Sequence, residues 1–321
     1  MSSPRPLPTR GAALSAPLQG ALYMIGAAFL FAMMNGAIRL LADGAQAESG
    51  EGMHPFQIAF LRNVFALSFM LPWLAHRGLG GLRTERLRLY FWRSGVALIA
   101  MLCWFSAVAY LPMADAVALN FTVPLFATAG AAIFLGEVVR ARRWTATAIG
   151  FLGVLIILRP GYTEITPEMA LPVIAACFMA ASILIVKSLS RTESPALVVL
   201  YMNLLLTPLS LVPAFFVWRW PNLAELGLGA FIGLCAVLAH IAFTRAFARA
   251  DASALMPFDY ARLPFVAVVG FVLFSELPDI WTWIGAAVIA AAAIYIAQRE
   301  ARVARERPTL RAGAESVQGR P

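Results

Sequence analysis

Two stretches of this chain decide its fold, AVALNFTVPLFATAGAAIFLGEVVRARRW at 116–144 and ASALMPFDYARLPFVAVVGFVLFSELPDIW at 252–281. Each begins with small residues, contains an internal proline, continues through an aromatic- and Gly/Ala-rich middle, and then reaches a glutamate that follows Gly or Ser. A tryptophan-led apolar segment follows each of them. The chain therefore contains an internal repeat, and the segments around its two copies indicate how the repeat is arranged.

The composition predicts a membrane protein with many spans. Of the 321 residues, 61% are hydrophobic and 13% are charged, and the mean hydropathy is +0.77. Soluble domains are about half apolar and about a quarter charged. Apolar runs of about 20 residues, the length that crosses a bilayer as a helix, recur along nearly the whole chain. We expect ten membrane-spanning helices, at about 20–41, 55–75, 89–111, 114–136, 144–159, 169–187, 195–217, 226–247, 252–275 and 280–297.

The repeat is predicted to be inverted. Its two copies occupy the fourth and the ninth expected spans, and an odd number of spans per repeat turns the second copy upside down. The loops agree, because three arginines follow Glu137 whereas the LPDI that follows Glu276 has no basic residue. Many secondary transporters are built from inverted repeats, with the substrate site near the midplane at the repeat interface. We predict an all-α integral membrane fold of two inverted five-helix repeats, at 20–161 and 168–297.

Basic residues orient these spans, because loops on the cytoplasmic side of a membrane carry an excess of Lys and Arg. With the N-terminus in the cytoplasm, the opposite side holds Arg39, Arg159 and Arg219, and the membrane interior holds Arg62 and Arg262. The other basic residues then belong to cytoplasmic segments: Arg5, Arg10, Arg77, Arg83, Arg86, Arg88, Arg93, Arg140, Arg142, Arg143, Lys187, Arg191, Arg245, Arg249, Arg299, Arg302, Arg305, Arg307, Arg311 and Arg320. Both termini are therefore predicted to be cytoplasmic, as a tail at 1–19 and a basic tail at 298–321. The pI of about 10.0 then reflects topology, and no nucleic-acid partner is expected.

The chain resembles the drug/metabolite transporter superfamily, and specifically bacterial proteins with two EamA domains. The resemblance covers roughly residues 20–297 and is carried by ALNFTVPLFATAGAAIFLGE, by the GFLGVLIILRPG that follows it, and by PFDYARLPF with the later FSELPD and WIGA. It implies a multi-pass protein of the bacterial inner membrane. Members of the superfamily move amino acids and related metabolites, riboflavin, S-adenosylmethionine or opine-type metallophores. The second-half signature is most similar to the group of riboflavin and S-adenosylmethionine carriers.

Prolines interrupt the two repeated helices at corresponding places. A proline within a helix removes one hydrogen bond, so Pro124 should free the carbonyl of Asn120, and Pro264 should free that of Tyr260. In lipid such a carbonyl must face protein, water or ligand. Helix breaks at matching positions in the two halves point to a transporter site. The alternative is a packing kink that neighbouring helices satisfy.

Asp259 and Arg262 are charged residues that share one face of the ninth span, because they lie three positions apart. At about 1.5 Å per residue, Arg262 lies near the midplane. A charge there costs about 2.5–3.5 kcal/mol, and such residues usually face a cavity or a partner. Either Arg262 holds an anionic group of the substrate while Asp259 orients it or takes a proton, or the two form a structural pair.

Four more residues are candidates for lining a substrate path. His240, the one histidine inside an expected span, is either a structural residue or a group that contacts substrate or carries a proton. Asn35 and Asn120 are predicted to line the path, although each could instead bond between helices. Trp104 could stack on a planar ligand, although membrane aromatics usually serve packing.

The sequence therefore predicts a secondary transporter that moves a small polar metabolite by alternating access. Its partners are expected to be the substrate, the lipid bilayer and a coupling proton as the candidate ion, and the protein is expected to be a monomer or a homodimer. No cofactor or metal is predicted, because the histidines and cysteines show no ligand spacing. The alternative, an intramembrane enzyme acting on a lipid or isoprenoid, usually needs clustered Asp/His or Glu/His near an interface, which this chain lacks. Glu137 and Glu276 are predicted to cap helices or fix loops.

Overall fold

The computed structural model describes residues 16–44, 52–77, 84–123, 125–127, 129–130, 141–159, 166–189, 193, 195–247, 258–259, 261–291 and 294–295. Within these ranges the chain is helical and contains no strand. The elements are α1 (Ala16–Ala42), α2 (Pro55–Arg77), α3 (Leu87–Tyr110), α4 (Met113–Asn120), α6 (Ala141–Leu158), the short η2 (Pro167–Met169), α7 (Ala170–Leu189), α8 (Pro195–Phe215), α9 (Leu223–Phe247) and α11 (Arg262–Phe274). A further apolar helix runs from Ile280 to Ala291.

Five of the described helices are long and apolar enough to cross a membrane. They cover Leu18–Ala42, Leu87–Tyr110, Pro167–Ile185, Leu197–Phe215 and Leu223–Phe243. Shorter apolar helices lie at Met113–Ala127, Ala148–Ile157, Arg262–Phe274 and Ile280–Ala291. The protein is thus an all-helical, multi-pass membrane protein, as its composition predicts.

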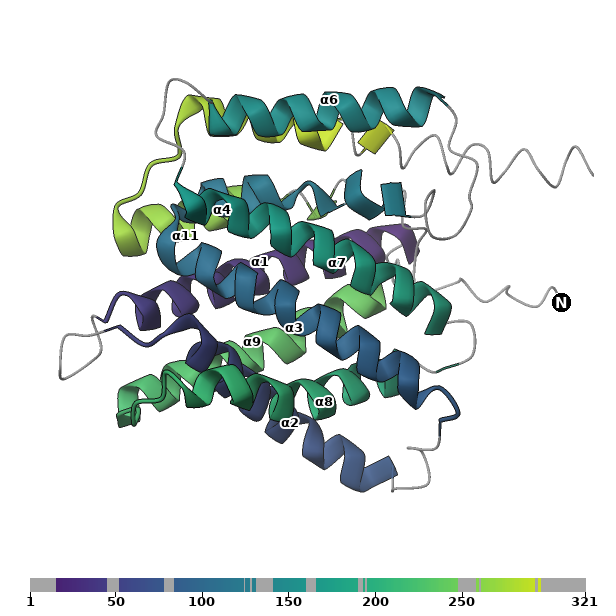
Figure 1. The fold of residues 1–321 in the computed structure, drawn as a ribbon, viewed down its shortest axis with the longest axis vertical. Coiled ribbons are helices and arrows are strands. Elements are labelled where there is room, and N and C mark those ends of the chain that lie inside the picture. Colours follow the sequence, from purple (N-terminus) through teal and green to yellow (C-terminus); the bar gives the residue numbers. More distant parts are fainter. Residues whose placement is uncertain are drawn as a thin grey trace, which may run out of the picture.

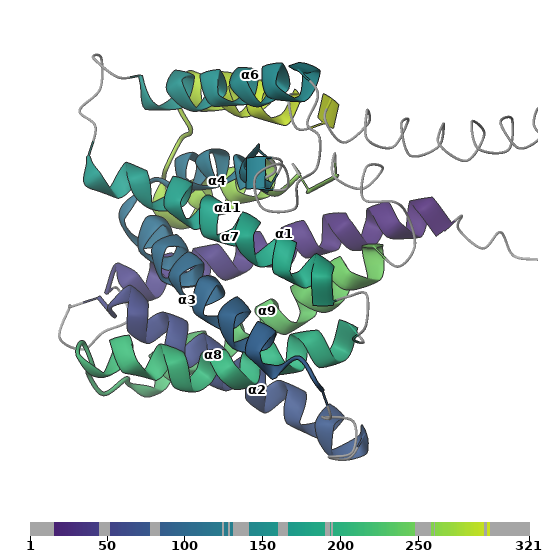
Figure 2. The same cartoon turned by 45° about the vertical axis from the view of Figure 1, so that its right-hand side comes forward.

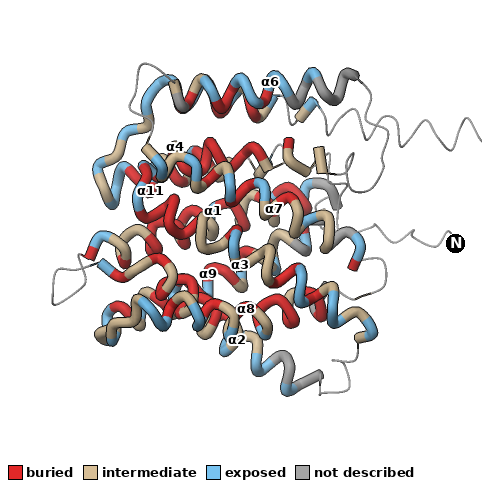
Figure 3. Tube along the Cα trace, in the orientation of Figure 1, coloured by how far each residue is buried: buried red, intermediate tan, exposed pale blue. Residues whose placement is uncertain are grey.

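Helices from the two halves of the chain pack against one another. α1 contacts α9 and α11 as well as α2 and α3, and α3 contacts α7 and α8. The side chains between these helices form one large apolar core, and the buried residues concentrate where the helices lie together (Figure 3). Apolar side chains also cover much of the outside, and those more than half exposed include Phe91, Trp92, Val212, Phe215, Val268 and Val272. Such an exterior suits contact with lipid rather than with water.

α6 and the helix Ile280–Ala291 form a layer of their own beside α4 and α11 (Figures 1 and 2). Two glycines allow this pair to pack closely. A Cβ on Gly285 would lie 2.6 Å from the carbonyl oxygen of Gly153, and one on Gly153 would lie 2.8 Å from the oxygen of Gly285. The backbones therefore touch directly, as is common where small residues face each other between membrane helices.

The repeated helices are both discontinuous, and the breaks lie close to the prolines. α4 ends at Asn120, and its last turn tightens, because the amide of Thr122 donates to the carbonyl of Leu119 at 3.2 Å. Pro124 itself lies outside the described residues, as does Tyr260. α11 begins at Arg262, so Pro264 occupies its first turn. There the missing N–H costs no hydrogen bond, because the first amides of a helix have no partner inside it.

Candidate functional site

Arg262 starts α11, and it is held from two sides. Its Nη2 donates to Oδ1 of Asp259 at 2.6 Å, and its Cζ lies 4.7 Å from the ring centre of Phe31 on α1. The side chain of Arg262 is 14% exposed, and that of Asp259 is 22% exposed. A guanidinium over an aromatic face is stabilised by the ring quadrupole, and more strongly so away from water. The predicted pair of Asp259 and Arg262 therefore exists in the structure, and an aromatic ring supports it.

Phe31 joins this pair to His240 on α9. The two rings meet edge to face, with centroids 5.4 Å apart and an angle of 84°. Nδ1 of His240 lies 2.7 Å from the carbonyl oxygen of Ala236, one turn earlier on α9. Groups from α1, α9 and the start of α11 thus meet in one place, and we call Phe31, His240, Asp259 and Arg262 the Arg262 cluster.

Two buried polar atoms on these same helices have no hydrogen-bond partner within the described ranges. They are Nε of Arg262 and Oδ1 of Asn35, which lies one turn after Phe31 on α1. Asn35 is 1% exposed. Buried donors and acceptors are nearly always paired with protein or water, so an unpaired one calls for an explanation. A substrate with both acceptors and donors would supply the missing partners.

Trp104 and Asn120 are also buried, and their described surroundings differ from those of the Arg262 cluster. Trp104 on α3 is 9% exposed and belongs to the main apolar core. Asn120, at the end of α4, places its Nδ2 3.6 Å from Sδ of Met179 on α7. Their assignment to a substrate path stays a prediction.

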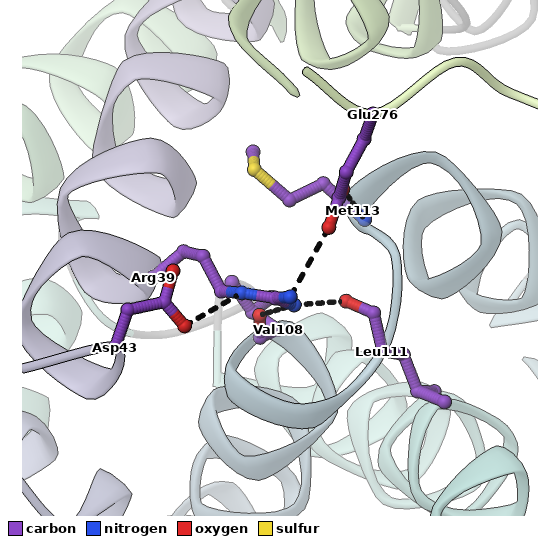
Figure 4. Close-up of polar contacts among 6 residues, drawn as sticks. All are labelled: Arg39, Asp43, Val108, Leu111, Met113 and Glu276. Atoms are coloured by element: carbon purple, nitrogen blue, oxygen red, sulfur yellow. Dashed lines mark hydrogen bonds and ion pairs between the residues drawn. The ribbon is translucent and has the colours of Figure 1, made fainter. Parts of the chain in front are cut away.

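A second polar group lies at the end of the bundle where α1 and α3 end and α4 begins (Figure 4). Arg39 donates from Nη2 to Oε1 of Glu276 at 3.1 Å and from Nε to Oδ1 of Asp43 at 3.1 Å. Its Nη1 donates to the carbonyl oxygens of Val108 and Leu111. We call these residues, together with Met113, the Arg39 network.

Glu276 holds the start of α4 in addition to Arg39. Its Oε2 accepts from the backbone amide of Met113 at 3.0 Å. Ser275 adopts a left-handed φ of 57°, and the amide of Glu276 donates to the carbonyl of Gly270 at 3.2 Å. This helix ending turns the chain back and directs the carboxylate at α4. Glu276 thus caps a helix, and its counterpart Glu137 lies outside the described residues.

The ion pair of Arg39 with Glu276 was not predicted, because nothing in the local sequence links residues so far apart. Phe31 was also missed, since an aromatic residue in an apolar helix carries no signal of its own. The burial of Arg93 was also missed. By sequence it counts among the cytoplasmic arginines, and in the structure it is 7% exposed and its Nη1 donates to the carbonyl of Val198 on α8 at 3.0 Å.

The sequence matches the pattern of the EamA-like transporter family at residues 18–159 and again at 167–298. Among similar proteins, a riboflavin transporter of Vibrio cholerae is 37% identical over 294 residues, which are 90% of this chain and 96% of that protein. A riboflavin transporter of Rhizobium johnstonii is 36% identical over 287 residues, 88% of this chain and 92% of that protein.

A further relative and a solved structure are also similar to this chain. An S-adenosylmethionine uptake transporter of Rickettsia bellii is 31% identical over 251 residues, 78% of this chain and 86% of that protein. A solved crystal structure matches 88% of this chain and 98% of the chain in that structure. Its TM-score is 0.59 at 20% sequence identity, so the two proteins share the fold. The chain belongs to the EamA-like transporter family, and it is a secondary transporter of a small metabolite.

Proposed function

We propose that this protein carries a flavin such as riboflavin across the bacterial inner membrane by alternating access, with the Arg262 cluster as its binding site. The observation that carries this proposal is the Arg262 guanidinium, which Asp259 and Phe31 hold in place while its Nε has no described partner. A flavin offers a flat ring for stacking and carbonyl acceptors for an arginine. The riboflavin transporters among the relatives support the choice of substrate.

The proposed topology has ten membrane-spanning helices in two inverted repeats, at 20–161 and 168–297. Both termini lie in the cytoplasm. The two segments that match the family pattern lie within a few residues of these repeats. The paired helix breaks at Asn120 and before Arg262 also support it. Transporter sites form where such discontinuous helices meet at the repeat interface.

The charges of the interior favour a flavin over S-adenosylmethionine. Arg62 is 6% exposed and donates from Nη1 to Oδ1 of Asn63 at 2.8 Å, and Arg93 is 7% exposed. Within the described part of the chain, neither arginine forms an ion pair with a carboxylate. Since charges interact strongly where water is excluded, this interior should disfavour a sulfonium cation and accept a neutral flavin.

The protein is proposed to act without catalysis. The described residues contain no group of His, Cys, Asp or Glu that could hold a metal ion. If transport is coupled to a proton, Asp259 is the candidate carrier, because it is the carboxylate bonded to Arg262.

Binding of riboflavin to the purified protein tests the site, since the fluorescence of riboflavin is quenched when its ring stacks on an aromatic group. We expect saturable quenching, and we expect Phe31→Leu to weaken binding about tenfold, because stacking on an aromatic ring contributes about 1–3 kcal/mol. Phe29→Leu is the matched control on the same helix. Its ring is 46% exposed and meets Phe265 instead of Arg262.

Three outcomes separate the alternatives in this titration. A hundredfold excess of S-adenosylmethionine should leave the quenching unchanged. Equal affinities of the Phe31→Leu and Phe29→Leu variants would place the site elsewhere. Displacement of riboflavin by S-adenosylmethionine would contradict the preference for a flavin.

A further inference from the structure

The Arg39 network joins the two halves of the transporter at one end. Arg39, Leu111 and Met113 belong to the first segment that matches the family, and Glu276 belongs to the second. Through Glu276 the segment after α11 is bonded both to the end of α1 and to the start of α4.

Two further contacts cross between the halves at the same end. Arg159, after α6, forms an ion pair with Asp279, and the hydroxyl of Thr282 donates to Asp115 in the first turn of α4. Each of the contacts that cross between the halves at this end ties a helix end of the first half to the stretch 276–282. These contacts therefore hold the two halves together at this end of the bundle. The halves would have to separate along the same boundary for this end to open.

We propose that Arg39 and Glu276 form a gate that holds this end of the transporter closed, and that they must separate before substrate can pass through it. This inference rests on the proposed alternating access. A site that opens to one side at a time needs a closed end on the other side, and breaking the cross-half bonds is the step that opens this one.

The exposure of the pair suits a contact that forms and breaks repeatedly. The side chain of Arg39 is 16% exposed and that of Glu276 is 22% exposed. A fully buried charge left without its partner is very costly. Groups that water can reach when they part face a much smaller barrier. Phe274 adds a ring 5.7 Å from Cζ of Arg39, which favours the closed position of the guanidinium.

A second ion pair at the same end provides a natural comparison. Arg219, before α9, pairs with Glu225 in the first turn of α9, and both belong to the second half. The link from Arg219 to the first half runs through its backbone, whose amide and carbonyl bond to the side chain of Gln57. Removing the side chain of Arg219 should therefore leave the boundary between the halves intact.

Spin labels on both sides of the boundary measure the opening directly. Tyr110 is 54% exposed at the end of α3, and Leu277 is 78% exposed just after Glu276. Cysteines at these two positions, in the full chain with Cys103, Cys177 and Cys235 replaced by serine, would carry the labels in lipid nanodiscs. Pulsed electron–electron resonance then gives the distribution of distances between them.

We expect Glu276→Gln to raise the population with long distances about fivefold or more, because hydrogen bonds to charged groups are the strong ones. Arg39→Gln should shift the distribution in the same direction, and Arg219→Gln should leave it unchanged. An unchanged distribution in both gate variants, or an equal shift in Arg219→Gln, would overturn the proposal.

Riboflavin binding is measured on the same samples, so that a failure of the gate proposal can be distinguished from a failure of the proposed function. Should the gate variants bind riboflavin and show the longer distances, both proposals stand. Longer distances without riboflavin binding in the wild type would refute the substrate and leave the gate. Unchanged distances with normal binding would refute the gate alone.

Discussion

Replacing Arg262 by alanine is expected to lower the initial rate of riboflavin transport at least about 100-fold in proteoliposomes. The substitution removes the charged group that is proposed to donate a hydrogen bond to the substrate. A hydrogen bond of this kind contributes about 1.5–3 kcal/mol. It also leaves Asp259 without its partner and Phe31 without the guanidinium over its ring. Arg262→Lys should recover part of the rate, because a lysine keeps the charge but cannot donate from a planar fork.

A double variant decides whether Arg262 binds substrate or only neutralises Asp259. If Asp259 and Arg262 only neutralise each other and neither has another role, Arg262→Ala combined with Asp259→Ala should restore transport, because no unpaired charge is left in the membrane. We expect the double variant to stay inactive while its thermal unfolding approaches that of the wild type. An Arg262→Ala protein that retains more than half of the wild-type rate would remove Arg262 from the site.

Gly285→Ala is expected to lower the free energy of unfolding by about 1–3 kcal/mol, which is the range for forcing an extra carbon into a packed core. The new Cβ would lie 2.4 Å from Cγ1 of Ile157 and 2.6 Å from the carbonyl oxygen of Gly153. The side chain of Ile157 can move aside, but the backbone oxygen cannot do so without separating α6 from its neighbour.

The matched control is Gly227→Ala on α9, where an added Cβ would meet no atom within 4 Å. Thermal unfolding of both variants in detergent compares them, and a difference of about 2–8 °C is expected for a chain of this size. If both variants unfold at the same temperature, the contact between α6 and Ile280–Ala291 is looser than the structure shows.

The sequence predicts the helical class because a span must be long and apolar to satisfy its backbone in lipid. The prolines predict breaks in the two repeated helices, and α4 ends at Asn120 while α11 begins at Arg262. The pairing of Asp259 with Arg262 also follows from local spacing, because residues three apart share a helix face. These features depend on residues that are close along the chain, so they can be predicted from the sequence.

Features that depend on lateral packing could not be predicted in this way. The sequence does not indicate that Arg93 is buried against α8, where the carbonyl oxygen of Val198 accepts a hydrogen bond from its guanidinium. Arg39 and Glu276 are far apart along the chain and meet only once α1 and α11 have packed together. Phe31 is one of many apolar residues on α1, and its contacts with Arg262 and His240 distinguish it. Each of these needed the relative placement of two helices.

Riboflavin counterflow tests the central claim most directly. Proteoliposomes loaded with unlabelled riboflavin and diluted into a trace of labelled riboflavin should accumulate the label transiently above its equilibrium level, with no ion gradient applied. Such an overshoot requires a carrier that exposes one site alternately to the two sides. We expect an overshoot for the wild-type protein and none for Arg262→Ala. Label uptake by the wild-type protein that is no faster than that of protein-free liposomes would contradict it.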